Sequence, residues 1–319
     1  MDLTDSTEGP GRSGRVAVGV SVAVAGGVGL AVQGRINGQL GTELRSGVLA
    51  AMVSFGVGLV IMIVVVAGTP RARAGLRRLP GSGLRWWQYA GGASGAFLVS
   101  GQGLTIATIG VSVFTVALVA GQVSSSLLVD QAGVGPGGRL PITTTRAVGA
   151  VIAIAAVVLA VSDELATPAR LWPAVLPLVA GAALAWQLAV NGRVRAAADD
   201  VLVPTLINFG IGAAVLIVAS TVDLLVRGAP APPPTEPWLY VGGILGIGAV
   251  ISMVAAVRLV SVLVVGLASV AGQLTGALLL DAVAPAPGEG LSAHTVAGAA
   301  LTLVAVVVAS APARRRLRG

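Results

Sequence analysis

The feature that most constrains this chain is a series of apolar runs, each about 20 residues long, the length that spans a 30 Å hydrocarbon layer as a helix. The chain has 319 residues, of which 55% are hydrophobic and only 10% are charged, and its mean hydropathy is +0.92. A soluble domain carries roughly 25% charged residues. We therefore expect an all-α integral membrane protein that crosses the bilayer many times.

The runs predict ten transmembrane helices. They cover residues 16–34, 47–67, 86–107, 111–130, 143–162, 171–190, 201–226, 238–257, 259–280 and 292–311. Two of the turns between them, near Gly110 and Arg258, are so short that the helices on either side must be antiparallel neighbours. Ten crossings place both ends of the chain on the same side of the membrane.

Arginine placement predicts which side that is, because loops rich in basic residues stay in the cytoplasm. All 20 basic residues are arginine, and sixteen of them fall on the side of the N-terminus while four fall on the other side. The four are Arg35, Arg45, Arg170 and Arg227. We expect both termini in the cytoplasm and, from the arginine, alanine and valine bias, a bacterial cytoplasmic membrane. The same placement explains the sequence pI of 11.4 without nucleic-acid binding.

The two halves of the chain are copies of each other. Gln33 and Asn37 in LAVQGRINGQL recur 154 residues later as Gln187 and Asn191 in AWQLAVNGRVR, and SFGVG (54–58) recurs as NFGIG at the same offset. WQYAGG (87–92) recurs as WLYVGG at an offset of 151. Matched segments in one order are a specific sign of duplication.

Five helices per copy predict that the second copy runs through the membrane upside down. The loops agree with this prediction, since TPRARAGLRRLPGSGLR in the first copy corresponds to the arginine-free GAPAPPPTEPW in the second. We expect a cytoplasmic tail at 1–15, a first five-span repeat at 16–165, an inverted second repeat at 166–311, and a basic cytoplasmic tail at 312–319.

Two glutamines are the first candidates for a substrate pathway. The stretch AGQVSSSLLVD contains Gln122 and Ser125, and AGQLTGALLLD contains Gln273 at the equivalent place. Gln122 lies eight residues before Asp130, about 12 Å along a helix, which places it near the middle of the membrane. A polar side chain there either lines a cavity or ties neighbouring helices together, and both interpretations stay open.

Other polar residues are candidates at the ends of the pathway. Gln33 and Asn37, and equally Gln187 and Asn191, lie four residues apart and share one helix face; they suit gates at the two mouths, or anchors for loops. Asp130 and Asp281 end their spans, where an acid serves capping, hydration or arginine pairing. No acidic residue lies in the central part of any predicted span, so coupling through a buried carboxylate has no obvious carrier.

Chemistry other than transport finds no support among the motifs. The chain has no cysteine, no phosphate loop, no metal-ligand cluster and no Ser/His/Asp arrangement, so we expect no catalytic residues, metal or cofactor, and no enzymatic activity. The expected partners are a small solute and the lipid bilayer, with the chain acting as a monomer or homodimer.

Several of these motifs together resemble the YdcZ-type branch of the drug/metabolite transporter superfamily. The segments that carry the resemblance are VQGRINGQLG, AAMVSFGVG, GGASGA, AGQVSSSLLVDQAG and RAVGAVI, followed by AWQLAVNGRVR, LINFGIG and AGQLTGALLLD. The resemblance implies a five-span unit with the EamA-like fold, fused here into a ten-span inner-membrane exporter. Small members of the superfamily use a glutamate in the first span as substrate and proton site, but that span here reads VAVAGGVGL.

The sequence therefore predicts a multi-pass exporter of a small metabolite or drug-like solute that works by alternating access. A largely neutral, amide-lined cavity favours a neutral or zwitterionic solute. Two alternatives remain open: a lipid flippase or scramblase on the same fold, and a membrane subunit that binds a partner without transporting.

Overall fold

The computed structural model describes residues 10–162, 172–257, 259–260, 262–285 and 291–310, and within these ranges it contains helices and turns but no β-strand. The long helices are α1 (Pro10–Glu43), α2 (Gly47–Gly68), α4 (Gly91–Gln131), α5 (Thr144–Ala160), α6 (Trp172–Ala198), α7 (Leu202–Arg227), α8 (Gly242–Val257), α9 (Val262–Val283) and α10 (Ala293–Ser310). Shorter elements between them include the helix α3 (Pro70–Arg78) and the single turns η1 (Leu79–Gly81), η2 (Trp86–Tyr89) and η5 (Pro237–Tyr240).

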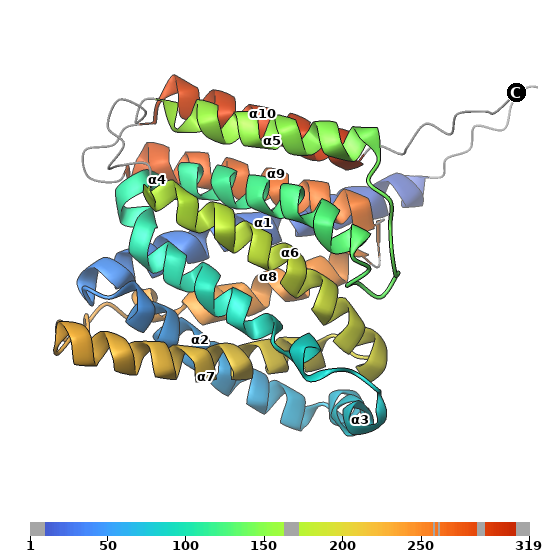
Figure 1. Cartoon of the computed structure of the whole chain (residues 1–319), viewed down its shortest axis with the longest axis horizontal. Helices are drawn as coiled ribbons and strands as arrows, with labels where there is room; N and C mark the ends of the chain where they lie inside the picture. The colour runs from blue at the N-terminus through green and yellow to red at the C-terminus, as the bar shows by residue number, and fades with distance from the viewer. Residues whose placement is uncertain (1–9, 163–171, 258, 261, 286–290, 311–319) are drawn as a thin grey trace, which may run out of the picture.

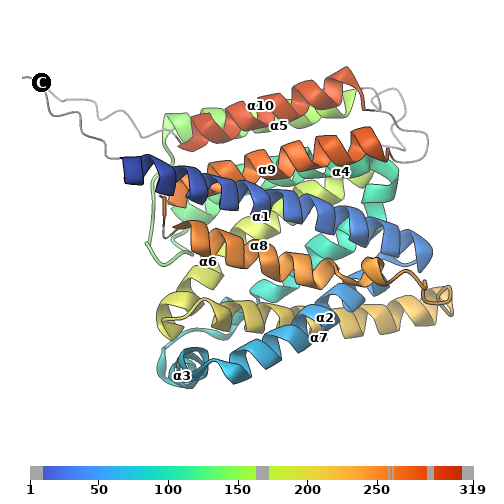
Figure 2. The same ribbon diagram turned by 180° about the vertical axis from the view of Figure 1, so that it is seen from behind.

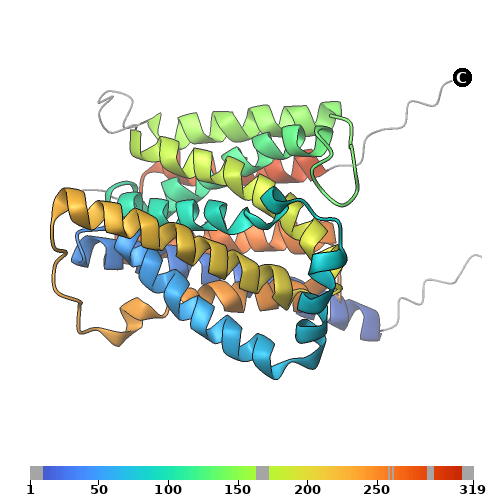
Figure 3. The same cartoon turned by 60° about the horizontal axis from the view of Figure 1, so that its bottom comes forward.

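The long helices lie side by side along one common direction (Figure 1). The α5–α10 pair forms one side of the molecule and the α2–α7 pair the opposite side, with α1, α4, α6, α8 and α9 between them (Figures 1 and 2). Seen from the α2–α7 side, these two helices cross the front of the bundle (Figure 3). The start of α1, the end of α6 and the end of α10 all lie at the same end of the molecule.

The outward faces of the bundle are apolar. Six helical segments are long and apolar enough to cross a membrane, and three shorter apolar helices lie beside them, within α5, α8 and α10. Large apolar side chains point outward from several helices, each more than half exposed: Val60, Val64, Val151, Ile217, Val218 and Leu225. Water would penalise so much exposed apolar surface, whereas lipid does not. The predicted all-helical membrane fold is confirmed at this level.

Helix α4 turns back on itself at Gly110 (Figure 1). The backbone of Gly110 has φ 75° and ψ 167°, outside the helical region and in a range that L side chains rarely adopt. The prediction of a tight turn near this residue is confirmed. Asp281 on α9 caps the second half of α4, because its carboxylate accepts hydrogen bonds from the backbone N–H groups of Val111 (2.9 Å) and Ser112 (2.6 Å).

The helices differ from the sequence-based prediction in three places. α1 continues to Glu43 and α6 to Ala198, past the predicted ends at 34 and 190, and one face of each extension is buried, with Ile36 and Leu40 on α1 and Val194 and Ala198 on α6. α1 also begins at Pro10, inside the segment expected as a tail. The helix α3 was not predicted at all. The expected boundary at 165–166, the turn residue Arg258 and the basic tail at 312–319 lie outside the described residues.

Candidate functional site

Two phenylalanines meet where the two copies contact each other. Phe55 on α2 and Phe209 on α7 are equivalent residues, and their ring centroids lie 5.2 Å apart with the rings tilted by 54°. Each ring packs on a glycine of the other copy: a Cβ atom added to Gly212 would lie 2.2 Å from Phe55, and one added to Gly58 would lie 2.2 Å from Phe209. This reciprocal contact marks the centre of the α2–α7 interface.

A first group of polar side chains lies between α1, α2, α4 and α8. Asn37 is fully buried, and its Nδ2 donates a hydrogen bond of 2.8 Å to Oε1 of Gln102 on α4. Two glycines of α8 face these side chains. A Cβ atom added to Gly242 would lie 2.5 Å from Oδ1 of Asn37, and one added to Gly246 would lie 3.0 Å from Nε2 of Gln33. We refer to Gln33, Asn37, Ser54 and Gln102 as the first amide cluster.

A second group occupies the equivalent place in the other copy, between α6, α7 and the first half of α4. A Cβ atom added to Gly91 would lie 2.9 Å from Oδ1 of Asn191 and 3.0 Å from Oδ1 of Asn208. One added to Gly95 would lie 3.4 Å from Nε2 of Gln187. We refer to Gln187, Asn191 and Asn208 as the second amide cluster.

Both clusters contain acceptors without a donor. Oδ1 of Asn37, Oε1 of Gln187 and Oδ1 of Asn208 are buried and, within the described part of the chain, accept no hydrogen bond. A buried acceptor left unpaired costs about 1–3 kcal/mol, which a solute or water carrying N–H or O–H groups would recover. Neither cluster contains a charged side chain, so the arrangement can recognise hydrogen-bond donors without requiring a full charge on the solute.

The second amide cluster also borders the phenylalanine pair. A Cβ atom added to Gly95 would lie 3.2 Å from Cζ of Phe55 as well as near Gln187. An aromatic face next to amide groups is a common way to hold a small organic molecule, since the ring supplies apolar contact and the amides supply orientation. Of the predicted residues, Gln187 thus lies near an aromatic side chain that the sequence analysis did not single out, whereas Gln33 and Asn37 lie together in the first amide cluster.

Gln122 and Gln273 lie in a different environment. Their backbones pack against glycines of neighbouring helices. A Cβ atom added to Gly181 on α6 would lie 2.8 Å from the backbone N of Gln122, and one added to Gly27 on α1 would lie 2.8 Å from the backbone N of Gln273. Gly181 precedes Gln187 by six residues, about 9 Å along the helix. Both glutamines are partly exposed, and among the described residues their side chains make no hydrogen bond.

Ser125 belongs to the same α4–α6 contact. Its Oγ donates a hydrogen bond of 3.2 Å to the backbone carbonyl of Ala182. In the neighbouring turns of these helices, a Cβ atom at Gly121 would lie 1.9 Å from the carbonyl oxygen of Leu178. The stretch AGQVSSS therefore contributes directly to close helix packing, whatever further role Gln122 has.

The two span-end acids have different partners although they are equivalent in sequence. Asp281 is buried and caps the second half of α4, as described above. Asp130 forms an ion pair with Arg146 at the start of α5, and both side chains are partly exposed. Each acid serves one of the structural roles considered for it, capping for Asp281 and arginine pairing for Asp130.

Glycines close one end of the bundle between α1, α2 and α4. A Cβ atom at Gly41 would lie 2.3 Å from the carbonyl oxygen of Gly103, and one at Gly47 would lie 2.6 Å from the carbonyl carbon of the same residue. No side chain fits between these backbones, so the end of α1 and the start of α2 both contact the first half of α4 directly. This contact lies on the side where α1 ends and α2 begins.

The corresponding end of the second copy is arranged differently. Gly38 on α1 packs on Ile106 of α4, and a Cβ atom added to Gly38 would lie 2.8 Å from Cγ2 of Ile106. Its equivalent, Gly192 on α6, instead lies 3.0 Å from Pro136 in the loop after α4, and Arg193 beside it donates hydrogen bonds to backbone carbonyls of that loop. Within the described residues, α6 and α8 share no extended contact like that of α1 and α4.

Three members of the clusters were missed in the sequence. Ser54 and Asn208 stand at the first position of the matched segments SFGVG and NFGIG, so the repeat itself contained the signal. Gln102 has no amide counterpart, because the equivalent position 151 residues later is Met253. A search restricted to residues repeated in both copies could not have found it.

These features define an integral membrane protein built from two related helical units, each with a cluster of buried, uncharged polar side chains. A family model described as "Putative inner membrane exporter, YdcZ" (DMT_YdcZ) matches residues 18–159 and again residues 172–308. The chain belongs to this family of the drug/metabolite transporters, as the resemblance predicted.

Comparison with solved structures gives the same fold. A protein whose structure is titled only "Crystal structure of protein" superposes with a TM-score of 0.56 over 95% of this chain and 99% of that one, at 21% sequence identity. At this identity the likeness concerns the fold alone. A search of curated proteins returns no match.

Proposed function

We propose that the chain is a secondary exporter that carries a small, neutral or zwitterionic solute with several hydrogen-bond donors across the cytoplasmic membrane by alternating access. Ten helical crossings, arranged as two inverted five-helix repeats with both termini in the cytoplasm, form the transporter. The two amide clusters and the Phe55–Phe209 pair bind the solute.

The inverted arrangement is supported by reciprocal contacts. Phe55 meets Gly212 as Phe209 meets Gly58, and Gly27 meets α9 as Gly181 meets the second half of α4. Contacts exchanged in this way are expected when two copies are related by a two-fold axis. The start of α1 and the end of α6 at one end of the molecule (Figure 1) agree with that relation.

The observation that carries the proposal is the set of unpaired acceptors on Asn37, Gln187 and Asn208. They come from both copies, and Gln187 lies near the ring of Phe55, so in this proposal one solute engages both halves at once. Because no charged group is present in either cluster, the site offers hydrogen-bond acceptors but no counter-ion, which favours a solute without net charge. A solute rich in N–H or O–H groups meets these conditions.

The glycine contact between Gly41, Gly47 and Gly103 supports a conformation closed on the side where α1 ends. The equivalent positions in the second copy are Arg195, Val201 and Val254, residue types too large for the same approach. In the proposed orientation the closed side is the cell exterior. In this proposal the closed exterior leaves the site to be reached from the cytoplasm, as loading an exporter requires.

A thermal-shift screen of metabolites on the purified full-length chain tests the proposal. We expect some solutes with several donors to raise Tm for the wild type and for Gln131→Leu, which makes the same chemical change at an exposed position on α4. The same solutes should leave Tm unchanged for Gln187→Leu. If Gln187→Leu responds as the wild type does, the second amide cluster is not the binding site.

A further inference from the structure

The short helix α3 differs from every other helix in direction. It is seen end-on in Figure 1, where the long helices run across the view, so it lies across the end of the bundle rather than along it. Figure 3 shows it beside the start of α7. It follows directly after α2, whose last turns expose Val64 and Val65. If the long helices cross the membrane, a helix in this orientation lies parallel to its surface, where amphipathic helices bind.

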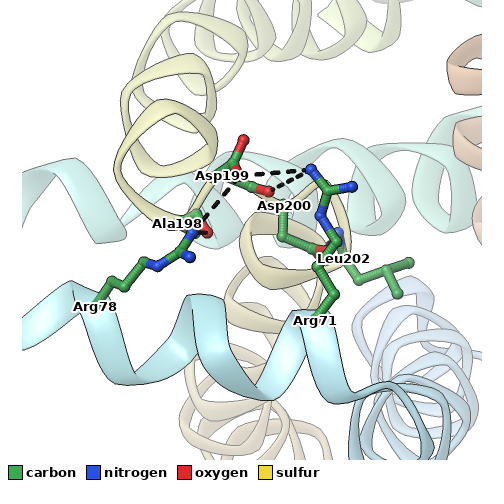
Figure 4. Close-up of polar contacts among 6 residues, drawn as sticks. All are labelled: Arg71, Arg78, Ala198, Asp199, Asp200 and Leu202. Atoms are coloured by element: carbon green, nitrogen blue, oxygen red, sulfur yellow. Dashed lines mark hydrogen bonds and ion pairs between the residues drawn. The ribbon is translucent and has the colours of Figure 1, made fainter.

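One face of α3 attaches to the turn between α6 and α7 (Figure 4). Ala72 and Gly75 are buried, and a Cβ atom at Gly75 would lie 2.8 Å from the carbonyl oxygen of Ala198. Arg71 and Arg78, two helical turns apart, both reach the carboxylate of Asp199, at 3.5 and 3.6 Å. Two of the four arginines of α3 are therefore used to hold it in place.

The other two arginines point away from the protein. Arg73 and Arg77 are four residues apart, so they share a helix face, and at 100° per residue this face lies opposite the one that Ala72 and Gly75 bury. Both are exposed, and in the part of the chain that the structure describes neither forms an ion pair. Trp86, shortly after α3, is 82% exposed and follows a further exposed arginine, Arg85.

The second copy shows that the fold does not need this basic helix. The equivalent connection, residues 228–236, reads GAPAPPPTE, contains no arginine and forms no helix. Both connections join the second and third helices of a copy. The arginines of α3 therefore suit an interaction that exists on one side of the membrane and not on the other.

We propose that Arg73 and Arg77, together with Arg85 and the indole of Trp86, form a binding surface for the phosphate groups of anionic phospholipids in the leaflet that α3 contacts. This is the cytoplasmic leaflet in the orientation proposed above. Basic residues directly next to a membrane span attract anionic lipids, and five arginines lie between the end of α2 and Trp86, of which Arg73, Arg77 and Arg85 form no ion pair with a described residue. Tryptophan side chains favour the headgroup region, where part of the ring meets hydrocarbon.

Native mass spectrometry of the full-length chain in detergent, with equimolar phosphatidylglycerol and phosphatidylcholine, tests this surface without depending on transport or orientation. The wild type should retain phosphatidylglycerol in preference to phosphatidylcholine. Arg73→Gln with Arg77→Gln should weaken phosphatidylglycerol binding by about 25-fold, since each arginine near a membrane surface contributes about fivefold. Arg73→Lys with Arg77→Lys should keep most of it.

A matched control removes two charges from the other end of the molecule, Arg45→Gln with Arg227→Gln, and should bind phosphatidylglycerol as the wild type does. Because Arg73 and Arg77 are exposed, circular dichroism should show the same helix content in all variants. The proposal is overturned if the wild type shows no preference for phosphatidylglycerol, if the Arg73/Arg77 glutamine variant binds it equally well, or if excess inorganic phosphate displaces it.

Discussion

Asn37 and Asn191 hold equivalent positions in the two copies but have different neighbours. Asn37 donates to Gln102 on α4, whereas Asn191 lies beside Asn208 on α7. Each copy has thus gained one additional amide, at positions where the other copy has methionine or serine. The proposed site is two-fold symmetric in its backbone and asymmetric in its chemistry, so a solute would bind it in a preferred orientation.

This difference predicts unequal stability effects. Asn37→Leu should destabilise the protein by about 1–3 kcal/mol, because it leaves Oε1 of Gln102 buried without a donor. Asn191→Leu should cost less, because Asn191 is partly exposed and donates no hydrogen bond within the described part of the chain. Thermal unfolding in detergent measures both. Adding Gln102→Leu to Asn37→Leu should restore part of the loss; an unchanged loss would mean that the hydrogen bond is not its source.

Gln122 and Gln273 remain predicted pathway residues, and substitutions there can separate an effect on transport from an effect on stability. Gln122→Leu and Gln273→Leu should leave Tm almost unchanged, because neither side chain makes a hydrogen bond to a described residue. If the side chains touch the solute during transport, efflux from proteoliposomes should fall strongly in both variants. Ordinary efflux would limit the role of these positions to helix packing.

At the level of helices, the bundle is held by backbones in direct contact. α1 approaches α9 at Gly27, and α6 approaches the second half of α4 at Gly181, at equivalent points of the two copies. In lipid, where burial of apolar side chains gives little driving force between helices, small residues that permit such approach are a main source of association. Many of the 45 glycines stand at such contacts or in turns, whereas others, such as Gly29 and Gly56, meet nothing within 4 Å.

Two glycines of α1 provide a matched pair for testing this. Gly27→Ala would place a Cβ atom 2.0 Å from the carbonyl oxygen of Ser269, so α1 and α9 must separate, and we expect a loss of about 1–3 kcal/mol. Gly29→Ala meets nothing within 4 Å and should be neutral or stabilising by up to about 1 kcal/mol, since alanine favours the helix. Thermal unfolding compares them; equal effects would contradict the packing account.

For the molecule as a whole, the proposed orientation places the α2–α4 connection inside the cell and the α7–α8 connection outside. The chain has no cysteine, so single introduced cysteines can be labelled without background. A membrane-impermeant maleimide should modify Pro233→Cys in intact cells and Arg73→Cys only after permeabilisation. The opposite pattern would invert the topology. Gly75 is unsuitable for this test, because a side chain there would collide with Ala198.

The helix α3 could not be predicted from the sequence because its position depends on a distant part of the chain. Its nine residues include four arginines, and its buried face carries only small residues, so no apolar period of 3.6 marks it as a helix. Its position depends on Asp199, 121 residues beyond its last residue, which holds Arg71 and Arg78. Local sequence contains no trace of that contact.

The sequence by itself determined the membrane class, the positions of the apolar helices, the tight turn at Gly110, the duplication and the family, because each depends on properties repeated along the chain: run length, charge placement and matched segments. It also predicted how far apart polar residues lie along a helix, since a helix rises 1.5 Å per residue. Only the tertiary structure decided which polar residues meet. Asn37 donates to Gln102, and the backbone of Gln122 packs against Gly181 of α6. Both contacts depend on helix rotation and on neighbours distant in sequence, and no periodicity within a single helix specifies them.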